Sequence, residues 1–289
     1  MMKKVLLTGA GGFLGARANV CFRELGWDVT SVGHRQLDIC DAAQVQQVLR
    51  DVRPDAVLHF AAVSSTAVSQ QQPALSHAVN VQGTENLAAA CAQTGSRLVY
   101  MSSDQVYNGC LAAGPLAEDT PLAPENVYGC DKLEAERRVA RICPNAVGLR
   151  LTWMYDVPRA GLPASGNLIC SVLRAALSGV PQRFAVRETR GVTWVWDVVH
   201  SLPALLEVPG GVYNAGSSGT QSTYTLALET AAALGCAHPE AFVLPDSERY
   251  AQHVRNLSMD TSLLAAFGIT FPENMEGVHT CLAACSWPV

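Results

Sequence analysis

The stretch Thr8-Gly9-Ala10-Gly11-Gly12-Phe13-Leu14-Gly15 decides the fold of this chain. Val5-Leu6-Leu7 before it predicts a buried strand, and residues 13–25 after it predict a helix closed by Gly26. Glycines at such a junction let the backbone turn tightly and approach a bound group without a Cβ in the way. The start of the helix offers unpaired N–H groups and a partial positive charge. The unit therefore predicts a dinucleotide pyrophosphate site formed by Gly9, Gly12, Phe13, Leu14 and Gly15.

The end of the second predicted strand, residues 28–32, bears on the choice of dinucleotide. A free ribose 2′-hydroxyl usually meets an acid there, about twenty residues beyond the glycine turn. This chain has Gly33-His34-Arg35 instead, with no acid before Asp38. The Arg35 guanidinium matches a 2′-phosphate in charge and geometry. We therefore expect NADP(H) to be preferred over NAD(H), with acceptance of both as the alternative.

Short apolar runs alternate with helical stretches through the first half of the chain, a pattern typical of a parallel sheet with crossover helices. Further strands are predicted at residues 56–60, 98–101 and 147–151, and helices at about 84–93 and 127–141. We predict an α/β fold, a Rossmann-type doubly wound parallel sheet with a smaller C-terminal substrate lobe. Residues 1–151 would form the NADP-binding domain, rejoined by late strands from about 180–210. Residues 152–289 would form mainly the substrate lobe, interleaved with the sheet.

Composition excludes several classes of protein. The formal net charge is −5 and the basic residues are scattered, which is not the footprint of a nucleic-acid-binding protein. The apolar run near the N-terminus has three residues, far fewer than the roughly 7–15 of a secretory core. We therefore expect a cytoplasmic protein with no membrane segment. The 10 cysteines form no Cys-x-x-Cys pair, and we expect free thiols, with Cys281 and Cys285 one helical turn apart.

The stretch Tyr128-Gly129-Cys130-Asp131-Lys132 places a phenol and an ammonium group on one face of a predicted helix. A nearby lysine cation favours the phenolate, so we expect Lys132 to lower the pKa of Tyr128 and assist proton exchange. Ser103 follows the fourth predicted strand, at the carboxyl edge where open α/β sheets bind ligands. Its hydroxyl could steady the developing charge on a substrate carbonyl. Each part alone is common, but the order of glycine turn, serine and Tyr-x-x-x-Lys is specific enough to predict an active site.

On these motifs the chain resembles the extended short-chain dehydrogenase/reductase superfamily. Within it, the chain looks most similar to dTDP-4-dehydrorhamnose reductases and to the regulatory β subunit of methionine adenosyltransferase. The resemblance runs from Lys3 to about Asp260. Besides the glycine turn, it is carried by the stretches Leu37-Asp38-Ile39, His59-Phe60-Ala61-Ala62, Asn80-Val81-Gln82-Gly83-Thr84, MSSDQVYNG from Met101, YGCDKLEAE from Tyr128, Leu149 to Trp153, and Arg255 to Asp260.

The resemblance implies roles for individual residues. Ser103, Tyr128 and Lys132 would be the catalytic triad, and Tyr128 and Lys132 would also hold the cofactor. Asp38 and Ile39 would meet the adenine, and Ala61 and Ala62 would line the cofactor groove. The residues implied on the substrate side are Asp104, Gln105, Trp153, Arg255 and Asn256.

The chain departs from the reductase pattern on the substrate side. Gln105 stands where the reductases usually carry a tyrosine, Val192 where they have a proline, and His253-Val254 where they have Arg-Pro. The C-terminal carboxylate that some reductases use for a metal-bridged dimer is not found in the sequence, so we predict no metal. The resemblance allows a homodimer.

We expect NADPH-dependent reduction of a nucleotide-linked 4-keto-6-deoxy sugar, with a small-molecule substrate and neither nucleic acid nor membrane as partner. Two alternatives stay open from the sequence. One is an NADP-binding regulatory subunit of a partner enzyme such as methionine adenosyltransferase. The other is a nucleotide-sugar epimerase or dehydratase, which would need further acid or base residues beside the triad.

Overall fold

The computed structural model describes residues 2–285, and within them six strands form the main sheet. Their order is β10 (Gly211–Ala215), β5 (Val147–Leu151), β4 (Arg97–Ser103), β3 (Ala56–His59), β1 (Lys4–Thr8) and β2 (Asp28–Val32). The pairs β1–β2, β1–β3 and β3–β4 are parallel, with Thr8 opposite both Val32 and His59. The chain starts in the inner strand β1 and adds β2 on one side of it and β3, β4, β5 and β10 on the other, so the predicted doubly wound Rossmann fold is confirmed.

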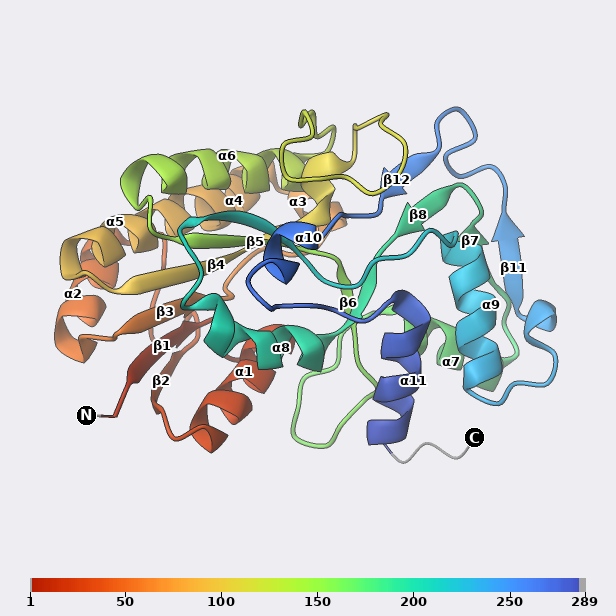
Figure 1. The fold of residues 1–289 in the computed structure, drawn as a ribbon, viewed down its shortest axis with the longest axis horizontal. Helices are drawn as coiled ribbons and strands as arrows, with labels where there is room; N and C mark the ends of the chain where they lie inside the picture. The colour runs from red at the N-terminus through yellow and green to blue at the C-terminus, as the bar shows by residue number, and fades with distance from the viewer. Residues whose placement is uncertain (1, 286–289) are drawn as a thin grey trace. The chain divides into compact units, whose positions relative to one another are not determined.

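Helices cover both faces of this sheet (Figure 1). On one face lie α2 (Ala42–Val52), α5 (Thr84–Thr94) and α6 (Val127–Ile142), and on the other lies α1 (Phe13–Glu24). Apolar side chains of the first face, such as Val45, Leu49 and Leu87, pack with Leu6 and Val57 of the strands. A sheet covered on both faces needs strands that are apolar throughout, which explains why all four residues of β3 are buried.

The segment between β3 and α5 is helical, although its residues show no helical period of apolar positions. It contains α3 (Thr66–Gln71), α4 (Pro73–His77) and the π-helical turn η1 (Ala78–Gly83). Pro73 occupies the first turn of α4, where its missing N–H is no loss. Gly83 lies against the side chain of Ile39, where a Cβ would not fit. These short helices pack against α6 and lead the chain into α5.

The described chain divides into two compact units. Unit 1 comprises residues 1–106, 123–150 and 199–213, and unit 2 comprises residues 107–122, 151–198 and 214–289. Unit 1 holds most of the main sheet and the helices named above. The α8 helix (Val195–Leu205) and strand β10 run from one unit into the other. Neither unit is therefore a single continuous segment.

Unit 2 consists of short strand pairs and helices. Its strands are β6 (Trp153–Tyr155), β7 (Gln182–Ala185), β8 (Glu188–Arg190), β9 (Val192–Trp194), β11 (Val243–Asp246) and β12 (Arg255–Leu257). They pair as β6–β9, β7–β11 and β8–β12. The helices α7 (Leu168–Ser178), α9 (Thr223–Ala233) and α11 (Asn274–Ala284) pack around a core that includes Tyr155, Val172 and Leu226, and the short α10 (Ser262–Ala265) precedes α11.

Three details complete the comparison with the sequence predictions. Strands predicted to rejoin the sheet at about residues 180–210 pair outside it as β7, β8 and β9, and the strand that does rejoin is β10, at Gly211–Ala215. No helix among the described residues is long and apolar enough to cross a membrane. All ten cysteines are free thiols.

Candidate functional site

The glycine turn lies between the carboxyl end of β1 and the start of α1. Gly9 has φ +65°, and a Cβ on it would lie 2.5 Å from the backbone nitrogen of Ala61. A Cβ on Gly15 would overlap the carbonyl oxygen of Gly9, whereas Gly11 has nothing within 4 Å. Among the described residues, no side chain caps the first N–H groups of α1, and its first turn carries no acid. These features suit a bound pyrophosphate, which needs close backbone approach and uncapped N–H donors.

The other residues predicted to meet the cofactor follow the neighbouring strands at the same edge. Arg35 is exposed in the turn after β2, and Asp38 follows it half-buried, with His34 4.0 Å away. Ala61 and Ala62 follow β3 and are half-buried. Ile39 differs from the others because its side chain is buried in the core of unit 1. The contact of Ile39 with an adenine stays a prediction.

Ser103, Tyr128 and Lys132 come together within unit 1. Ser103 ends β4, and Tyr128 and Lys132 lie one turn apart in the first two turns of α6. Asn126 begins this helix by accepting a hydrogen bond from the Gly129 N–H at 2.7 Å. The Lys132 ammonium nitrogen lies 5.6 Å from the centre of the Tyr128 ring. All three side chains are buried, so the group forms a desolvated site at the carboxyl end of β4.

The electrostatics of Tyr128 differ from the sequence prediction. Burial raises the pKa of its phenol well above the usual value, a hydrogen bond with Ser103 works in the opposite direction, and the Asp104 charge adds to the rise. The prediction of a lowered Tyr128 pKa is wrong, because desolvation outweighs the hydrogen bond with Ser103. The consequence is a phenol that stays protonated at neutral pH and can serve as an acid.

Lys132 is itself perturbed. Burial lowers the pKa of its ammonium group to about 8, while the carboxylates of Glu136 and Asp131 oppose the change. The ammonium group donates a hydrogen bond to the Met101 carbonyl oxygen at 2.9 Å. Lys132 is therefore still mostly charged at neutral pH, in a place where a cation is costly to keep.

Two buried polar networks around the triad were missed by the sequence analysis. Glu136, one turn beyond Lys132, accepts hydrogen bonds from Arg150 at 2.8 and 3.1 Å and from Ser102. His59, at the end of β3, bonds to the hydroxyls of Thr8 at 2.7 Å and Thr84 at 3.0 Å. Burial, together with the charge of Lys132, lowers the pKa of His59 to about 3, so its ring is neutral. Arg150, inside the apolar run of residues 147–151, was a sequence signal for the first network. A guanidinium buried in a strand needs an acidic or other polar partner.

Asp104 and Gln105, predicted on the substrate side, are buried directly after Ser103. The Asp104 carboxylate accepts hydrogen bonds from Ser103 Oγ and Gln105 Nε2, each at 3.1 Å. Gln105 also accepts one from Asn126 at 3.2 Å. The structure thus gives Gln105 a role in fixing the start of α6, and Asp104 a role in fixing Ser103.

Trp153, Arg255 and Asn256 belong to unit 2. The Arg190 guanidinium lies 5.3 Å from the centre of the Trp153 ring. Arg255 forms an ion pair of 3.2 Å with Glu188 on the neighbouring strand. Asn256 donates to the carbonyl oxygen of Ala112 at 3.0 Å, which attaches it to the loop 107–122. Their roles toward a substrate stay predictions.

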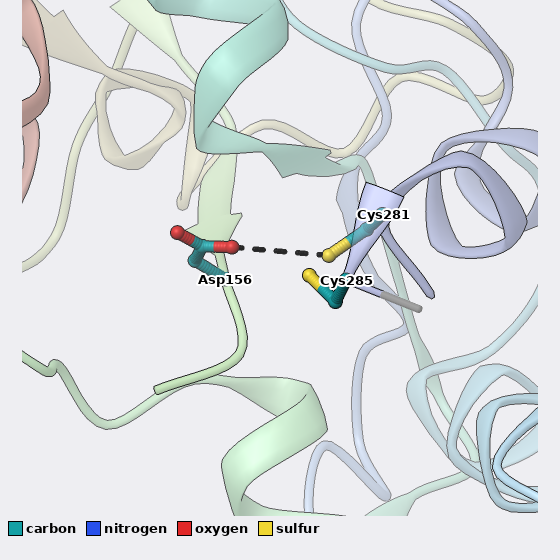
Figure 2. A group of neighbouring side chains, drawn as sticks. All are labelled: Asp156, Cys281 and Cys285. Carbon is teal, nitrogen blue, oxygen red and sulfur yellow. Dashed lines mark hydrogen bonds between the residues drawn. The ribbon is translucent and has the colours of Figure 1, made fainter. Parts of the chain in front are cut away.

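One group of potential metal ligands lies within residues 2–285, and it is in unit 2. Asp156, Cys281 and Cys285 have ligand atoms within 4.8 Å of one another, and Figure 2 shows the carboxylate facing the two thiols of α11 and its end. The carboxylate already accepts hydrogen bonds from the indoles of Trp194 at 3.1 Å and Trp196 at 3.2 Å. The Arg159 guanidinium pairs with it at 3.3 Å and donates to Cys285 at 3.1 Å. Burial also raises the pKa of both thiols, so a cation would have to displace a guanidinium and ionise a thiol.

Comparison with known proteins defines the family. Residues 2–286 match the RmlD substrate binding domain family, so the chain belongs to it. A dTDP-4-dehydrorhamnose reductase of Streptomyces griseus is 33% identical over 237 residues, covering 80% of this chain and 76% of that protein. The methionine adenosyltransferase 2 subunit beta of Xenopus laevis is 32% identical over 263 residues, covering 85% and 74%.

Solved structures agree on the fold. The dTDP-4-dehydrorhamnose reductase of Bacillus anthracis, in complex with NADP, superposes with a TM-score of 0.85 at 24% identity, covering 98% of this chain and 99% of that one. The UDP-glucose 4-epimerase of Thermus thermophilus, complexed with NAD, gives 0.79 at 25% identity, covering 99% and 100%. Dinucleotide-binding enzymes thus share this fold along their whole length.

Proposed function

We propose that this chain is an NADPH-dependent reductase of a nucleotide-linked 4-keto-6-deoxy sugar, of the dTDP-4-dehydrorhamnose reductase type. The observation that carries the proposal is the buried group of Ser103, Tyr128 and Lys132 at the carboxyl end of β4, beside an intact glycine turn. Membership of the RmlD family and 33% identity to a named reductase support the substrate class.

The chain's own residues supply the proton chemistry. A bound nicotinamide supplies the hydride that the ketone carbon receives. Tyr128 donates its phenolic proton to the carbonyl oxygen, and the product is an alcohol. The raised pKa of Tyr128 keeps the phenol in the acid form that this direction requires. Ser103 exchanges its hydrogen bond to Asp104 for one to the same carbonyl oxygen and stabilises the charge that develops there.

Residues at the carboxyl edge of unit 1 would hold the cofactor. The backbone of Gly9, Gly12 and the first turn of α1 would bind the pyrophosphate, and Arg35 the 2′-phosphate. Lys132 would bind the nicotinamide ribose and place a positive charge beside Tyr128. NAD(H) would bind more weakly, because it lacks the phosphate that Arg35 recognises.

Turnover of dTDP-4-dehydrorhamnose, followed by NADPH absorbance, tests the proposal. The wild-type protein should oxidise NADPH in step with sugar alcohol formation. The variant Tyr128→Phe should lose about 10²- to 10⁴-fold in kcat while binding NADPH within about threefold of wild type. A Tyr128→Phe variant that turns over normally would contradict the assignment of Tyr128 as the acid.

A regulatory role is the second candidate, favoured by the 32% identity to a methionine adenosyltransferase subunit. It predicts NADPH binding without oxidation by any keto-sugar, and co-purification with a partner enzyme. An epimerase would instead interconvert sugars with no net NADPH consumption. Product analysis in the same assay separates the three functions.

A further inference from the structure

The carboxylate of Glu136 is held rigidly beneath the triad. Glu136 lies one helical turn beyond Lys132 on α6 and is 4% exposed. Arg150 on β5 contacts both of its oxygens, with Nη2 at 2.8 Å and Nε at 3.1 Å. The hydroxyl of Ser102 on β4 donates to the same carboxylate. A helix and two adjacent strands thus fix this one negative charge.

The buried ion pair of Glu136 and Arg150 is expected to contribute little to the stability of the fold. The cost of desolvating a carboxylate and a guanidinium offsets most of their attraction, and an apolar pair of similar volume often serves as well. Its position is the informative feature. Residues four apart on a helix share a face, so the Glu136 carboxylate stands on the side of α6 that carries Lys132 and, two turns back, Tyr128.

Lys132 needs such a charge because its surroundings disfavour an ammonium ion. It is 4% exposed, and it donates a hydrogen bond to a neutral acceptor, the Met101 carbonyl. Burial is the largest influence on its pKa, and Glu136 is the largest opposing one, ahead of Asp131. Without that opposition, the group would lose its proton closer to neutral pH.

We propose that Glu136 is a positioning residue for the reaction, one that keeps Lys132 charged beneath Tyr128 and is itself held in place by Arg150 and Ser102. The proposal rests on the catalytic role proposed above for Lys132. Glu136 does not touch the reacting atoms and acts through Lys132.

Other charged and titratable groups face Lys132 from the elements around it. Asp131 precedes it on α6, with Ser76 at 2.5 Å and the half-exposed His77 at 3.3 Å. The partners of Asp131 are thus the Ser76 hydroxyl and the half-exposed His77 ring, whereas the partner of Glu136 is the buried guanidinium of Arg150. Tyr128 on α6 and His59 on β3 also lie near Lys132, whereas the Asp104 charge acts on Tyr128 and Arg150 pairs with Glu136. His59 is neutral, and Tyr128 stays protonated, so neither replaces the charge of Glu136 near neutral pH.

The composition makes a direct test simple, because the chain contains three lysines, Lys3, Lys4 and Lys132. Protein labelled with ¹³C at the lysine ε-carbon, without cofactor, gives three signals, and Lys132→Arg assigns the buried one. Titration should give a Lys132 midpoint near pH 8 in the wild-type protein. Glu136→Gln should lower the midpoint by at least about one pH unit.

Glu134→Gln is the matched control, since Glu134 lies on the same helix but is only partly buried and pairs with Arg138 at 2.8 Å. Its Lys132 midpoint should equal that of the wild type. Glu136→Asp keeps the charge and should restore most of the shift. A folded Glu136→Gln protein with an unchanged midpoint overturns the proposal.

If Glu136→Gln does not fold because Arg150 is left unpaired, the double variant Glu136→Gln/Arg150→Gln removes both buried charges and serves instead. Arg150→Gln is then the reference, because loss of the guanidinium by itself raises the pKa of Lys132. The double variant should titrate at lower pH than Arg150→Gln, and equal midpoints in these two variants overturn the proposal. Turnover separates this proposal from the proposed function. If Lys132→Ala retains full turnover, the catalytic role of Lys132 fails even where the titration shows that Glu136 controls its charge.

Discussion

The ammonium nitrogen of Lys132 lies 5.6 Å from the centre of the Tyr128 ring, and both side chains are buried on one face of α6. Burial acts on the two groups in opposite directions, raising the pKa of Tyr128 and lowering that of Lys132 to about 8. Each shift favours the uncharged form, as desolvation requires. Across the neutral range the tyrosine thus remains an acid and the lysine remains mostly a cation.

The pH dependence of reduction should follow Lys132. Its charged form predominates below its pKa, so kcat/KM should be level below about pH 8 and fall up to tenfold per pH unit above it. Tyr128 should add no limb in this range, because its pKa lies higher. Steady-state rates from pH 6 to 10 measure the profile. Lys132→Arg, which keeps its charge throughout, should remove the limb, and a limb that persists in this variant rules out Lys132 as its source.

The glycine turn should tolerate a methyl group at one position and not at another. Gly9→Ala places a side chain at φ +65° and against the Ala61 backbone, so we expect a loss of more than about 2 kcal/mol of stability and of NADPH binding. Gly11→Ala is the control, since nothing lies within 4 Å of its Cβ. Thermal unfolding with and without NADPH measures both variants. Equal melting temperatures for the two would contradict the close contact between Gly9 and Ala61.

Arg35 should set the preference between the two dinucleotides. A charge-assisted hydrogen bond contributes about 1.5–3 kcal/mol, so Arg35→Ser should weaken NADPH binding roughly tenfold to a hundredfold and leave NADH within about threefold. Fluorescence titration with each cofactor gives the ratio. Arg50→Ser removes an equally exposed charge from α2 and should change neither affinity. If Arg35→Ser weakens the binding of NADPH and NADH equally, a contact between Arg35 and the 2′-phosphate does not explain the preference for NADPH.

The group of Asp156, Cys281 and Cys285 should bind no metal ion. Its carboxylate is engaged by Trp194, Trp196 and Arg159, so dialysis against a chelator and addition of Zn²⁺ should both leave the melting temperature unchanged. Asp156→Ala should instead cost at least about 1–3 kcal/mol, because it leaves the buried indole N–H of Trp194 without its acceptor. A fall in melting temperature on chelation, absent from Cys281→Ser, would show a metal there.

The sequence predicted the parts of this protein that depend on local pattern. The run of residues 147–151 forms β5 with the predicted bounds, and the helix predicted at 127–141 is α6. Residues 66–83 were missed because each helix there is too short for a hydrophobic period and is ordered by its neighbours. The sequence also placed Ser103, Tyr128 and Lys132 as a group.

Burial is what the sequence did not reveal in the candidate site. The direction of the Tyr128 pKa shift was predicted wrongly, because the sequence shows that a phenol and a cation are four residues apart but not whether they are buried. The hydrogen bond that the Gln105 amide accepts from Asn126 at the start of α6 was not foreseen, and its predicted place on the substrate side stays a prediction. The partner of Glu136 is Arg150, distant in sequence, and only the three-dimensional pairing of β5 with α6 brings them together.

The division of the chain into interleaved segments has a consequence for its biosynthesis. Unit 1 needs residues 1–106, 123–150 and 199–213, and its sheet is completed by β10. A ribosome releases these residues in order, at about 5–20 per second, so the edge of β5 stays open while the intervening segments emerge. An open strand edge is a template for unwanted pairing. Nascent chains that stall before residue 211 should therefore be the form of this protein that most needs a chaperone.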